Sequence, residues 1–230
     1  MQGRSAVAPE AQPMLVLDEP VTGIILAGGR STRMLQEKAW VELNGRPLVR
    51  WVLDALRMAT DEQIIVARHV GRFETLGVPV VIDKVATRSP LAGLHAGLKA
   101  VPTDLNVVVA CDLPLVRPEM VALLARAVGP THAAVPYVGV GAPPPPGQFT
   151  TAREAGLQPL CAAYRRSCLG PLEKLLSVGH IATAAIVSVV KARIVGPDEW
   201  RTVDPDGRSF FNVNTPEDVI AAAHILSRAD

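Results

Sequence analysis

The sequence is poor in several features that would indicate particular classes of protein. Only 4% of its 230 residues are aromatic, and its formal net charge is +1. Nucleic-acid recognition needs clustered cations and aromatic platforms, so we expect neither a nucleic-acid surface nor attraction to an anionic membrane. The three cysteines include no CxxC pair, which favours reduced thiols over a disulfide framework or a zinc site.

Several catalytic signatures are also missing. The five histidines are scattered without HExxH spacing, which argues against a zinc hydrolase. There is no GxSxG elbow, no GxxxxGK[ST] phosphate loop and no GxGxxG dinucleotide fingerprint. The longest apolar run, Ile181–Val190, is too short to span a bilayer, and residues 1–20 lack the sustained apolar stretch of a secretory signal. We therefore expect a cytoplasmic protein.

The residues that are abundant predict a packed α/β domain. Apolar residues make up 49% and charged residues 20%, a balance that supports one sizeable core. Short β-branched runs alternate with helix-like segments, which is typical of a mainly parallel sheet with crossover helices. Strands are expected at 22–27, 63–67, 79–83, 105–111, 133–137, 158–164 and 192–195. Helices are expected at 47–58, 91–100, 118–128, 171–178 and from 216 to about 224–227.

We expect a flexible N-terminal leader over residues 1–20 and a single domain over residues 21–230. A proline-rich insertion is expected at 138–156, because Pro143–Pro146 are flanked by glycines and interrupt the alternation of strands and helices. No internal repeat is present.

The strongest functional signal is L-A-G-G-R-S-T-R-M, residues 26–34, which leaves the end of the first expected strand. Ligands bind at this end of the strands in open α/β sheets. Gly28 and Gly29 allow backbone N–H groups to approach an anion without an intervening Cβ. Three cations accompany the loop: Arg30, Arg33 and Lys38. This combination suits a triphosphate whose charge grows in the transition state, although a glycine turn with solvated basic residues also explains it.

A second signal is Asp112, which follows the apolar run Val107–Ala110. A carboxylate at the carboxyl end of a buried parallel strand points into the ligand crevice, where it can bind a Mg²⁺ that bridges phosphates. Mg²⁺ takes only one or two protein carboxylates, so a single aspartate is sufficient. A helix N-cap is the competing interpretation. Cys111 is interpreted as a packing residue, because the adjacent carboxylate disfavours its thiolate.

Two further segments have both structural and functional explanations. Asp83 precedes S-P-L-A-G at residues 89–93, which also fits an ordinary strand, turn and helix. Thr215 is expected to cap a helix that begins at Pro216. Asn212 and Asn214 lie two residues apart in an extended segment, so their side chains face the same side and could reach one ligand.

These segments, in this order, resemble the MobA family of molybdenum cofactor guanylyltransferases. The matching sequences are L-A-G-G-R-S-T-R-M followed by Lys38, Asp83 with S-P-L-A-G, C-D-L-P around Asp112, and N-V-N-T-P-E-D at residues 212–218. The resemblance covers roughly residues 21–225. It implies a three-layer Rossmann-like nucleotidyltransferase fold, with a mainly parallel central sheet flanked by helices.

The resemblance also implies roles for individual residues. Asp112 would bind the cofactor Mg²⁺, while Lys38 and Arg33 would stabilise the developing charge. Asn212 and Asn214 would hold the pterin acceptor. The nucleotide would be bound by Leu26, Ala27, Gly28, Gly29, Lys38, Asp83 and Asp112. A smaller match, at residues 158–160 and 164–166, is expected to line the acceptor side.

We therefore expect transfer of GMP from GTP to Mo-molybdopterin with release of pyrophosphate, and transient contact with proteins that deliver or accept the cofactor. A CTP-dependent cytidylyltransferase is one alternative, but its L-A-A-G opening differs from the glycine pair found here. A sugar-phosphate nucleotidyltransferase is another, and the N-x-N-T-P segment fits it less well. Leu35 and Glu37 stand where the family has glycine and aspartate, so a nucleotide-binding module with weakened catalysis is the third.

Overall fold

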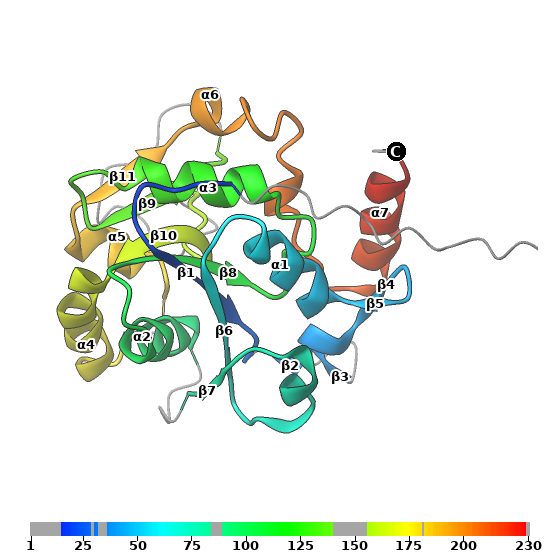
Figure 1. Cartoon of the computed structure of the whole chain (residues 1–230), viewed down its shortest axis with the longest axis horizontal. Helices are drawn as coiled ribbons and strands as arrows, with labels where there is room; N and C mark the ends of the chain where they lie inside the picture. Colours follow the sequence, from blue (N-terminus) through cyan, green and yellow to red (C-terminus); the bar gives the residue numbers. More distant parts are fainter. Residues whose placement is uncertain are drawn as a thin grey trace, which may run out of the picture.

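A central seven-stranded sheet organises the computed structural model, which describes residues 15–28, 30–31, 36–83, 89–139, 156–180 and 182–228 (Figure 1). The strand order is β11-β9-β10-β8-β1-β6-β7. The strands are β1 (Val21–Leu26), β6 (Glu62–Ala67), β7 (Val80–Ile82), β8 (Leu105–Ala110), β9 (Ala133–Pro136), β10 (Cys161–Arg165) and β11 (Ala192–Val195). Only β10 runs antiparallel to its neighbours within this sheet. The expected mainly parallel sheet is confirmed.

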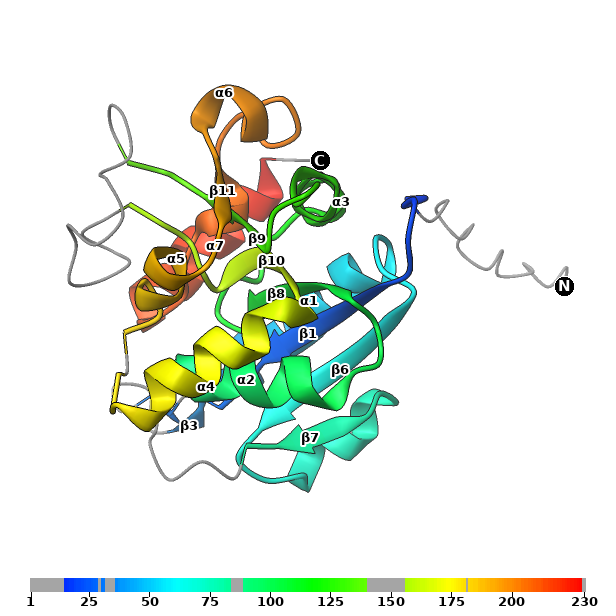
Figure 2. The same ribbon diagram turned by 90° about the vertical axis from the view of Figure 1, so that its left-hand side faces the viewer.

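Helices cover both faces of the sheet, as Figure 2 shows. One face packs against α1 (Leu48–Arg57) and α3 (Pro118–Ala127), and the other against α2 (Pro90–Ala100) and α4 (Leu169–Ser177). Successive side chains of β1 serve both layers, because Ile24 packs with the second group of helices and Ile25 with the first. Both are fully buried, which explains the uninterrupted apolar runs. No helix in the described ranges is long and apolar enough to cross a membrane.

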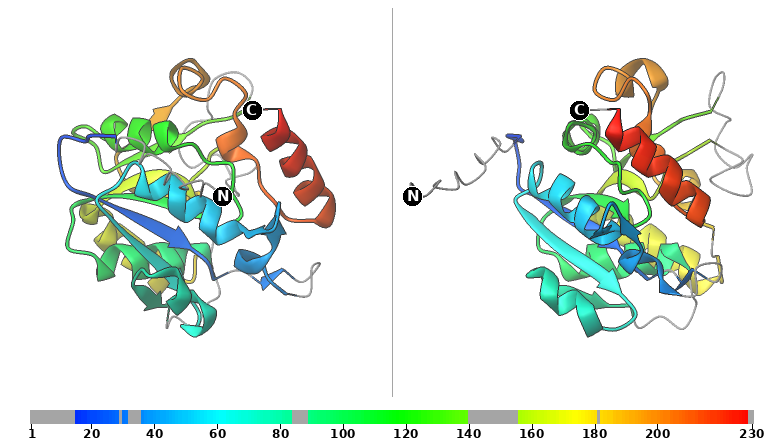
Figure 3. Two further views of the ribbon diagram at one scale, coloured as in Figure 1. Left: turned by 45° about the vertical axis from the view of Figure 1, so that its right-hand side comes forward. Right: turned by 90° about the vertical axis from the view of Figure 1, so that its right-hand side faces the viewer.

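The C-terminal helix α7 (Pro216–Ser227) lies beside a hairpin of β4 (Glu42–Leu43) and β5 (Arg46–Pro47) (Figure 3). A third apolar cluster joins them, and it includes Leu43, Val213 and Ala222. The expected cap of this helix is confirmed. The Asp218 N–H donates to the Thr215 hydroxyl at 3.2 Å, and the Thr215 N–H donates to the Asp218 carboxylate at 2.9 Å, a reciprocal capping box.

Several short elements were not expected. They are β2 (Arg30–Ser31), β3 (Gln36–Glu37), η1 (Lys38–Trp40), η2 (Gly71–Leu76), η3 (Arg166–Cys168), η4 (Arg208–Phe210), α5 (Ala185–Val189) and α6 (Pro197–Trp200). Elements of two to six residues carry too little periodicity to be recognised. Pro47, expected inside the first helical turn, is instead the extended N-cap of α1.

Residues 15–20 differ from the flexible leader that was expected over residues 1–20. Leu15 donates its N–H to the Met58 carbonyl at 2.8 Å, and both Leu15 and Leu17 pack against the main core. Isolated apolar residues among acids show no periodicity, so this packing is not predictable from the pattern of residues. The rest of the leader, and residues 140–155 of the expected insertion, lie outside the described residues.

Candidate active site

The carboxyl ends of neighbouring parallel strands bring candidate residues from three segments to one edge of the sheet. Leu26 of β1 is paired with Ala110 of β8 and Val66 of β6. Gly28, Asp112 and Arg68 each follow one of these three aligned residues by two positions, so they emerge at the same level of the sheet edge. Backbone hydrogen bonds continue the pairing past the strand ends, from the Ala27 N–H to the Val66 carbonyl (2.8 Å) and from the Cys111 N–H to the Leu26 carbonyl (3.1 Å).

Lys38 lies at the centre of the polar cluster at this edge. Its ammonium donates to Oδ2 of Asp112 and to Oδ1 of Asn214. The side chains of Lys38 and Asp112 are 13% and 16% exposed, so the ion pair is largely shielded from bulk water, and its interaction is stronger than that of a surface pair. Lys38 thus contacts both Asp112, which is expected to act on the phosphates, and Asn214, which is expected to hold the acceptor.

The two asparagines share one side of their extended segment, as predicted. The Asn214 amide donates to Oδ1 of Asn212 at 2.8 Å. The start of α7 fixes this segment, because the Asp218 carboxylate accepts the Asn214 N–H at 2.8 Å. The N–H groups of Asn214 and Thr215 both donate to this carboxylate and hold the pKa of Asp218 below its ordinary value, and Asn214 contributes most. The Val213 N–H donates to the Asp112 carbonyl at 2.9 Å, which ties the asparagines to the end of β8.

Asp112 offers an oxygen for a metal ion. Its Oδ2 accepts from Lys38, whereas Oδ1 is buried and has no hydrogen-bond partner among the described residues. A buried carboxylate oxygen without a partner is costly, and one such oxygen matches the small number of protein ligands that Mg²⁺ takes beside phosphates and water. The competing N-cap interpretation is wrong, since α3 begins at Pro118 and its N-cap is Arg117.

The first part of the glycine loop is open to a ligand. Leu26 and Ala27 are buried, while Gly28 is exposed. A Cβ added to Gly28 would meet one described neighbour, Cγ of Arg68, at 4.0 Å, so packing against the described residues does not require glycine there. This leaves room for the close approach of a ligand to the backbone that the sequence predicts. Gly29 and Arg33 lie outside the described residues, and their roles stay predictions.

Asp83 emerges at the same edge, with a partner that the sequence analysis missed. It follows β7 and is 8% exposed. Arg68 donates from Nη1 to the Asp83 carbonyl at 3.2 Å, and the same nitrogen lies 3.6 Å from Oδ2. The next residue, His69, contacts Glu37 through its Nε2 at 2.6 Å. Arg68 directly follows an apolar strand, the same signal that drew attention to Asp112, so the sequence could have indicated it.

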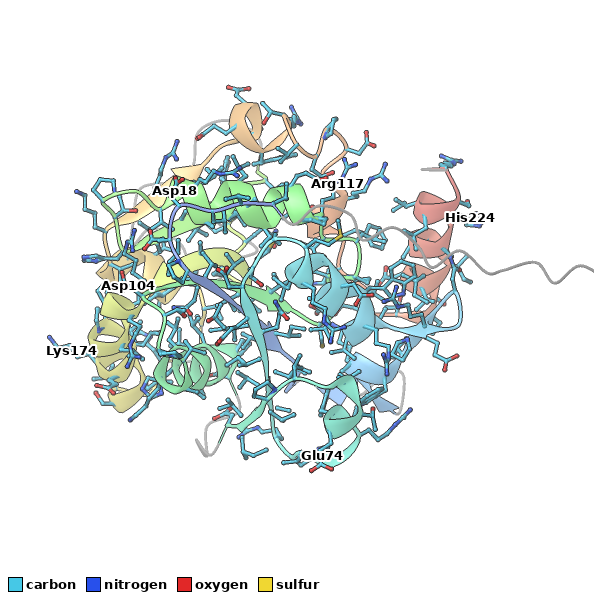
Figure 4. The ribbon with its side chains drawn as sticks, in the orientation of Figure 1. Asp18, Glu74, Asp104, Arg117, Lys174 and His224 are labelled. Atoms are coloured by element: carbon cyan, nitrogen blue, oxygen red, sulfur yellow. The ribbon has the colours of Figure 1, made fainter. Side chains whose placement is uncertain are left out.

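The expectation that residues 164–166 line the acceptor side is wrong. β10 runs antiparallel to β8, so Arg165 is paired with Leu105 at the start of that strand. Tyr164 is fully buried and donates to the Pro159 carbonyl at 2.7 Å. Arg165 pairs with Asp104, which Figure 4 shows on the side of the molecule opposite His224 of α7. The antiparallel direction of β10 reverses the edge at which these residues emerge.

Cys111 is a packing residue, as expected, although the main cause differs. Burial contributes most to the raised pKa of its thiol, and the neighbouring Asp112 carboxylate raises it further. A thiol that stays protonated is not a nucleophile. Cys161 and Cys168 are also buried and unpaired, and burial raises the pKa of each to about 12. None of the three cysteines is therefore a candidate nucleophile.

Comparisons with known proteins show the family of this chain. Residues 23–191 match the MobA-like NTP transferase domain. The chain belongs to this family. A relative from Pelotomaculum thermopropionicum, named probable molybdenum cofactor guanylyltransferase, is 33% identical over 201 residues, which are 87% of this chain and 91% of that protein. The molybdenum cofactor guanylyltransferase of Desulfosudis oleivorans is 30% identical over 202 residues, 87% of this chain and 93% of that one.

Two solved nucleotide-related proteins have the same architecture. The molybdopterin-guanine dinucleotide biosynthesis protein A of Archaeoglobus fulgidus superimposes with a TM-score of 0.73 at 26% identity, covering 90% of this chain and 99% of that one. A nucleotidyl transferase from Methanothermobacter thermautotroptrophicus gives a TM-score of 0.67 at 21% identity, covering 92% and 99%. At this lower identity the likeness shows the fold alone. The expected nucleotidyltransferase fold is confirmed.

Proposed function

We propose that this MobA-like protein acts in the cytoplasm and transfers GMP from GTP to Mo-molybdopterin. The observation that carries the proposal is the cluster of Lys38, Asp112 and Asn214 beside the glycine loop. The names of the most similar relatives, which span nearly the whole domain, support guanine as the base and the molybdenum cofactor as the acceptor. In the reaction, the terminal phosphate of the pterin forms a bond to the α-phosphorus of GTP while the bond to the β-phosphate breaks.

The nucleophile needs no strong general base, because a phosphate monoester is already anionic. Catalysis then depends on positioning and on stabilising negative charge. The ammonium of Lys38 lies at the sheet edge that the glycine loop shares, where it can stabilise the charge that accumulates on the leaving pyrophosphate. Asp112 and Asn214 hold this ammonium in place. Backbone N–H groups at Gly28 and Gly29 are proposed as further donors, and Arg33 as a second cation.

Mg²⁺ is the proposed cofactor, and Asp112 would hold it through Oδ1. When bound, it would supply positive charge that offsets part of the negative charge of the nucleotide phosphates. The fit rests on the buried Oδ1 that has no partner in the described part of the chain. No group of three or more His, Cys, Asp or Glu residues able to hold a metal is found in that part, so the donor set suits an ion that keeps most of its ligands from substrate and water.

Asn212 and Asn214 are proposed to orient the acceptor. Both residues are exposed, and their side chains are hydrogen-bonded to each other. Asn214 also contacts Lys38, so the pair of amides lies next to the lysine. An acceptor held there would have its phosphate near the nucleotide that binds the same cluster. The cap of α7 contributes indirectly, because it holds the backbone of Asn214.

The test is release of pyrophosphate by purified protein with Mo-molybdopterin, Mg²⁺ and each of GTP, CTP, UTP and ATP in turn. Release with GTP alone supports the proposal. Release with CTP would retain the mechanism and overturn the donor. Folded protein that binds GTP but releases no pyrophosphate would instead be a nucleotide-binding module.

A further inference from the structure

Arg68 and Asp83 lie side by side at the ligand edge of the sheet. β6 and β7 are parallel neighbours in which Ala67 is paired with Ile82, so the next residue of each strand emerges at the same level. The Asp83 N–H donates to the Ala67 carbonyl at 2.9 Å and fixes this register. Both side chains therefore begin where ligands bind in parallel sheets.

The contacts of Arg68 hold Asp83 and also reach the glycine loop. Its Nη1 lies 3.2 Å from the Asp83 carbonyl oxygen and 3.6 Å from Oδ2. The Asp83 side chain is 8% exposed and that of Arg68 is 30% exposed. A carboxylate this deeply buried requires hydrogen bonds or an opposite charge. Arg68 supplies the opposite charge, and its hydrogen bond to the Asp83 carbonyl holds the guanidinium beside the carboxylate. The arginine stem also lies beside Gly28, where an added Cβ would be 4.0 Å from Cγ.

The order of the strands indicates how a bound nucleotide would lie across the edge of the sheet. Strands β8, β1, β6 and β7 are neighbours in that order. Asp112 follows β8, the glycine loop follows β1, and Asp83 follows β7. Three strand spacings separate Asp112 from Asp83, which is about 14 Å. A nucleotide carries its phosphates at one end and its base at the other. With the phosphates beside Lys38 and Asp112, the base lies towards Arg68 and Asp83.

We propose that Arg68 is a positioning residue that fixes the carboxylate of Asp83 against the donor base and thereby sets the preference for guanine. The inference rests on the proposed function. Guanine presents two adjacent donors, N1–H and the exocyclic 2-amino group, which a fixed carboxylate can accept together. Cytosine and adenine lack this pair. A carboxylate free to rotate would accept from many donors and discriminate less.

The experiment compares GTP with inosine triphosphate, which lacks only the 2-amino group. In the wild-type protein, kcat/KM for GTP should exceed that for inosine triphosphate by roughly ten- to a hundredfold, as expected for one hydrogen bond to a charged group. In Arg68→Gln this ratio should fall towards one, mainly through a raised KM for GTP with kcat changed less. Arg68→Lys should restore part of the ratio. Arg72→Gln is the matched control, because Arg72 is exposed and stacks on Trp40.

Two results would overturn the inference. The first is an unchanged ratio in Arg68→Gln. The second is a loss of discrimination against 7-deaza-GTP in that variant, which would mean that Arg68 itself reads N7. If Arg68→Gln does not fold, judged by its thermal unfolding, Asp83→Asn provides the same comparison and should also lower the ratio. Failure of the proposed function is distinguishable, because the wild-type protein would then not turn over GTP at all.

Discussion

At the scale of single residues, the ammonium of Lys38 is held between two oxygens from distant parts of the chain. Asp112 Oδ2 and Asn214 Oδ1 both accept from it. A cation fixed in this way needs little rearrangement when negative charge develops near it, which is the basis of electrostatic stabilisation in enzymes.

Replacing Lys38 with alanine should lower kcat by roughly 10²–10³, the usual effect of removing one preorganised charge-stabilising donor. The measurement is pyrophosphate release under saturating GTP and acceptor. Lys99→Ala is the control, because Lys99 lies exposed in the last turn of α2. Turnover like that of the wild type would remove Lys38 from the mechanism.

Replacing Asp112 with asparagine should raise the Mg²⁺ concentration that gives half-maximal activity, because the amide is a weaker ligand for a hard cation than the carboxylate. The variant also loses the ion pair with Lys38, so the Mg²⁺ titration should be repeated with Lys38→Ala, in which the midpoint should stay near that of the wild type. Asp206→Asn is the control for an exposed acid. An unchanged midpoint in Asp112→Asn would contradict the metal-ligand role.

Several site residues were predictable from the sequence, and others were not. Asp112 and Lys38 follow from the position of a carboxylate and cations after buried strands. The facing of Asn212 and Asn214 follows from their spacing. The pairing of Arg68 with Asp83 did not follow, because it depends on β6 and β7 being adjacent in the sheet. Strand order is set by tertiary packing, which a single sequence does not display.

At the scale of elements, α2 is pressed closely onto the sheet. A Cβ added to Gly97 would lie 2.7 Å from Cγ2 of Ile24 in β1 and 3.2 Å from Cγ2 of Val66 in β6. Both neighbours belong to the buried strands that lead into the site. The glycine therefore serves close packing, even though glycine weakens a helix interior.

Gly97→Ala should destabilise the protein by about 1–3 kcal/mol, because overcrowding outweighs the gain in helix propensity. Gly170→Ala in α4 is the matched comparison, since an added Cβ meets no described atom within 4 Å. That variant should gain about 0.5 kcal/mol. Chemical denaturation of both variants measures the difference, and equal effects would show that the close contact has no energetic cost.

Long elements were predicted more accurately than short ones. β1, β8 and α3 lie within one or two residues of their expected bounds, because their burial imposes a pattern over many positions. The direction of β10 was not predicted, and the placement of residues 164–166 failed with it. An apolar run is equally compatible with parallel and antiparallel pairing, so only the partner strands decide.

At the scale of the whole molecule, the segment before β1 belongs to the folded domain. Leu15 and Leu17 pack on the core, and Glu19 pairs with Arg165 at 2.8 Å. Glu19 is the largest cause of the raised pKa of Arg165, with Asp104 contributing further. This segment joins the side of the sheet away from the ligand edge, so it should affect stability without touching the chemistry.

Leu17→Ala should lower the free energy of unfolding by about 1 kcal/mol, since a half-buried leucine contributes part of the value for full burial. Val16→Ala should change it by less than about 0.5 kcal/mol, because the Val16 side chain is 80% exposed. Turnover at saturating substrate should be the same in both variants. If the two substitutions had equal effects on unfolding, the segment would not be packed on the core.

The contact between Lys38 and Asn214, which are 176 residues apart, also orders events during protein synthesis. At roughly 5–20 residues per second, Asn214 leaves the ribosome about ten to thirty-five seconds after Lys38. A growing chain can complete its first strands and its glycine loop in that interval, yet it has no oxygen from the C-terminal segment for the lysine to contact. Assembly of the reaction centre is therefore delayed until translation is almost finished, and an unfinished chain lacks a residue that the chemistry is proposed to use.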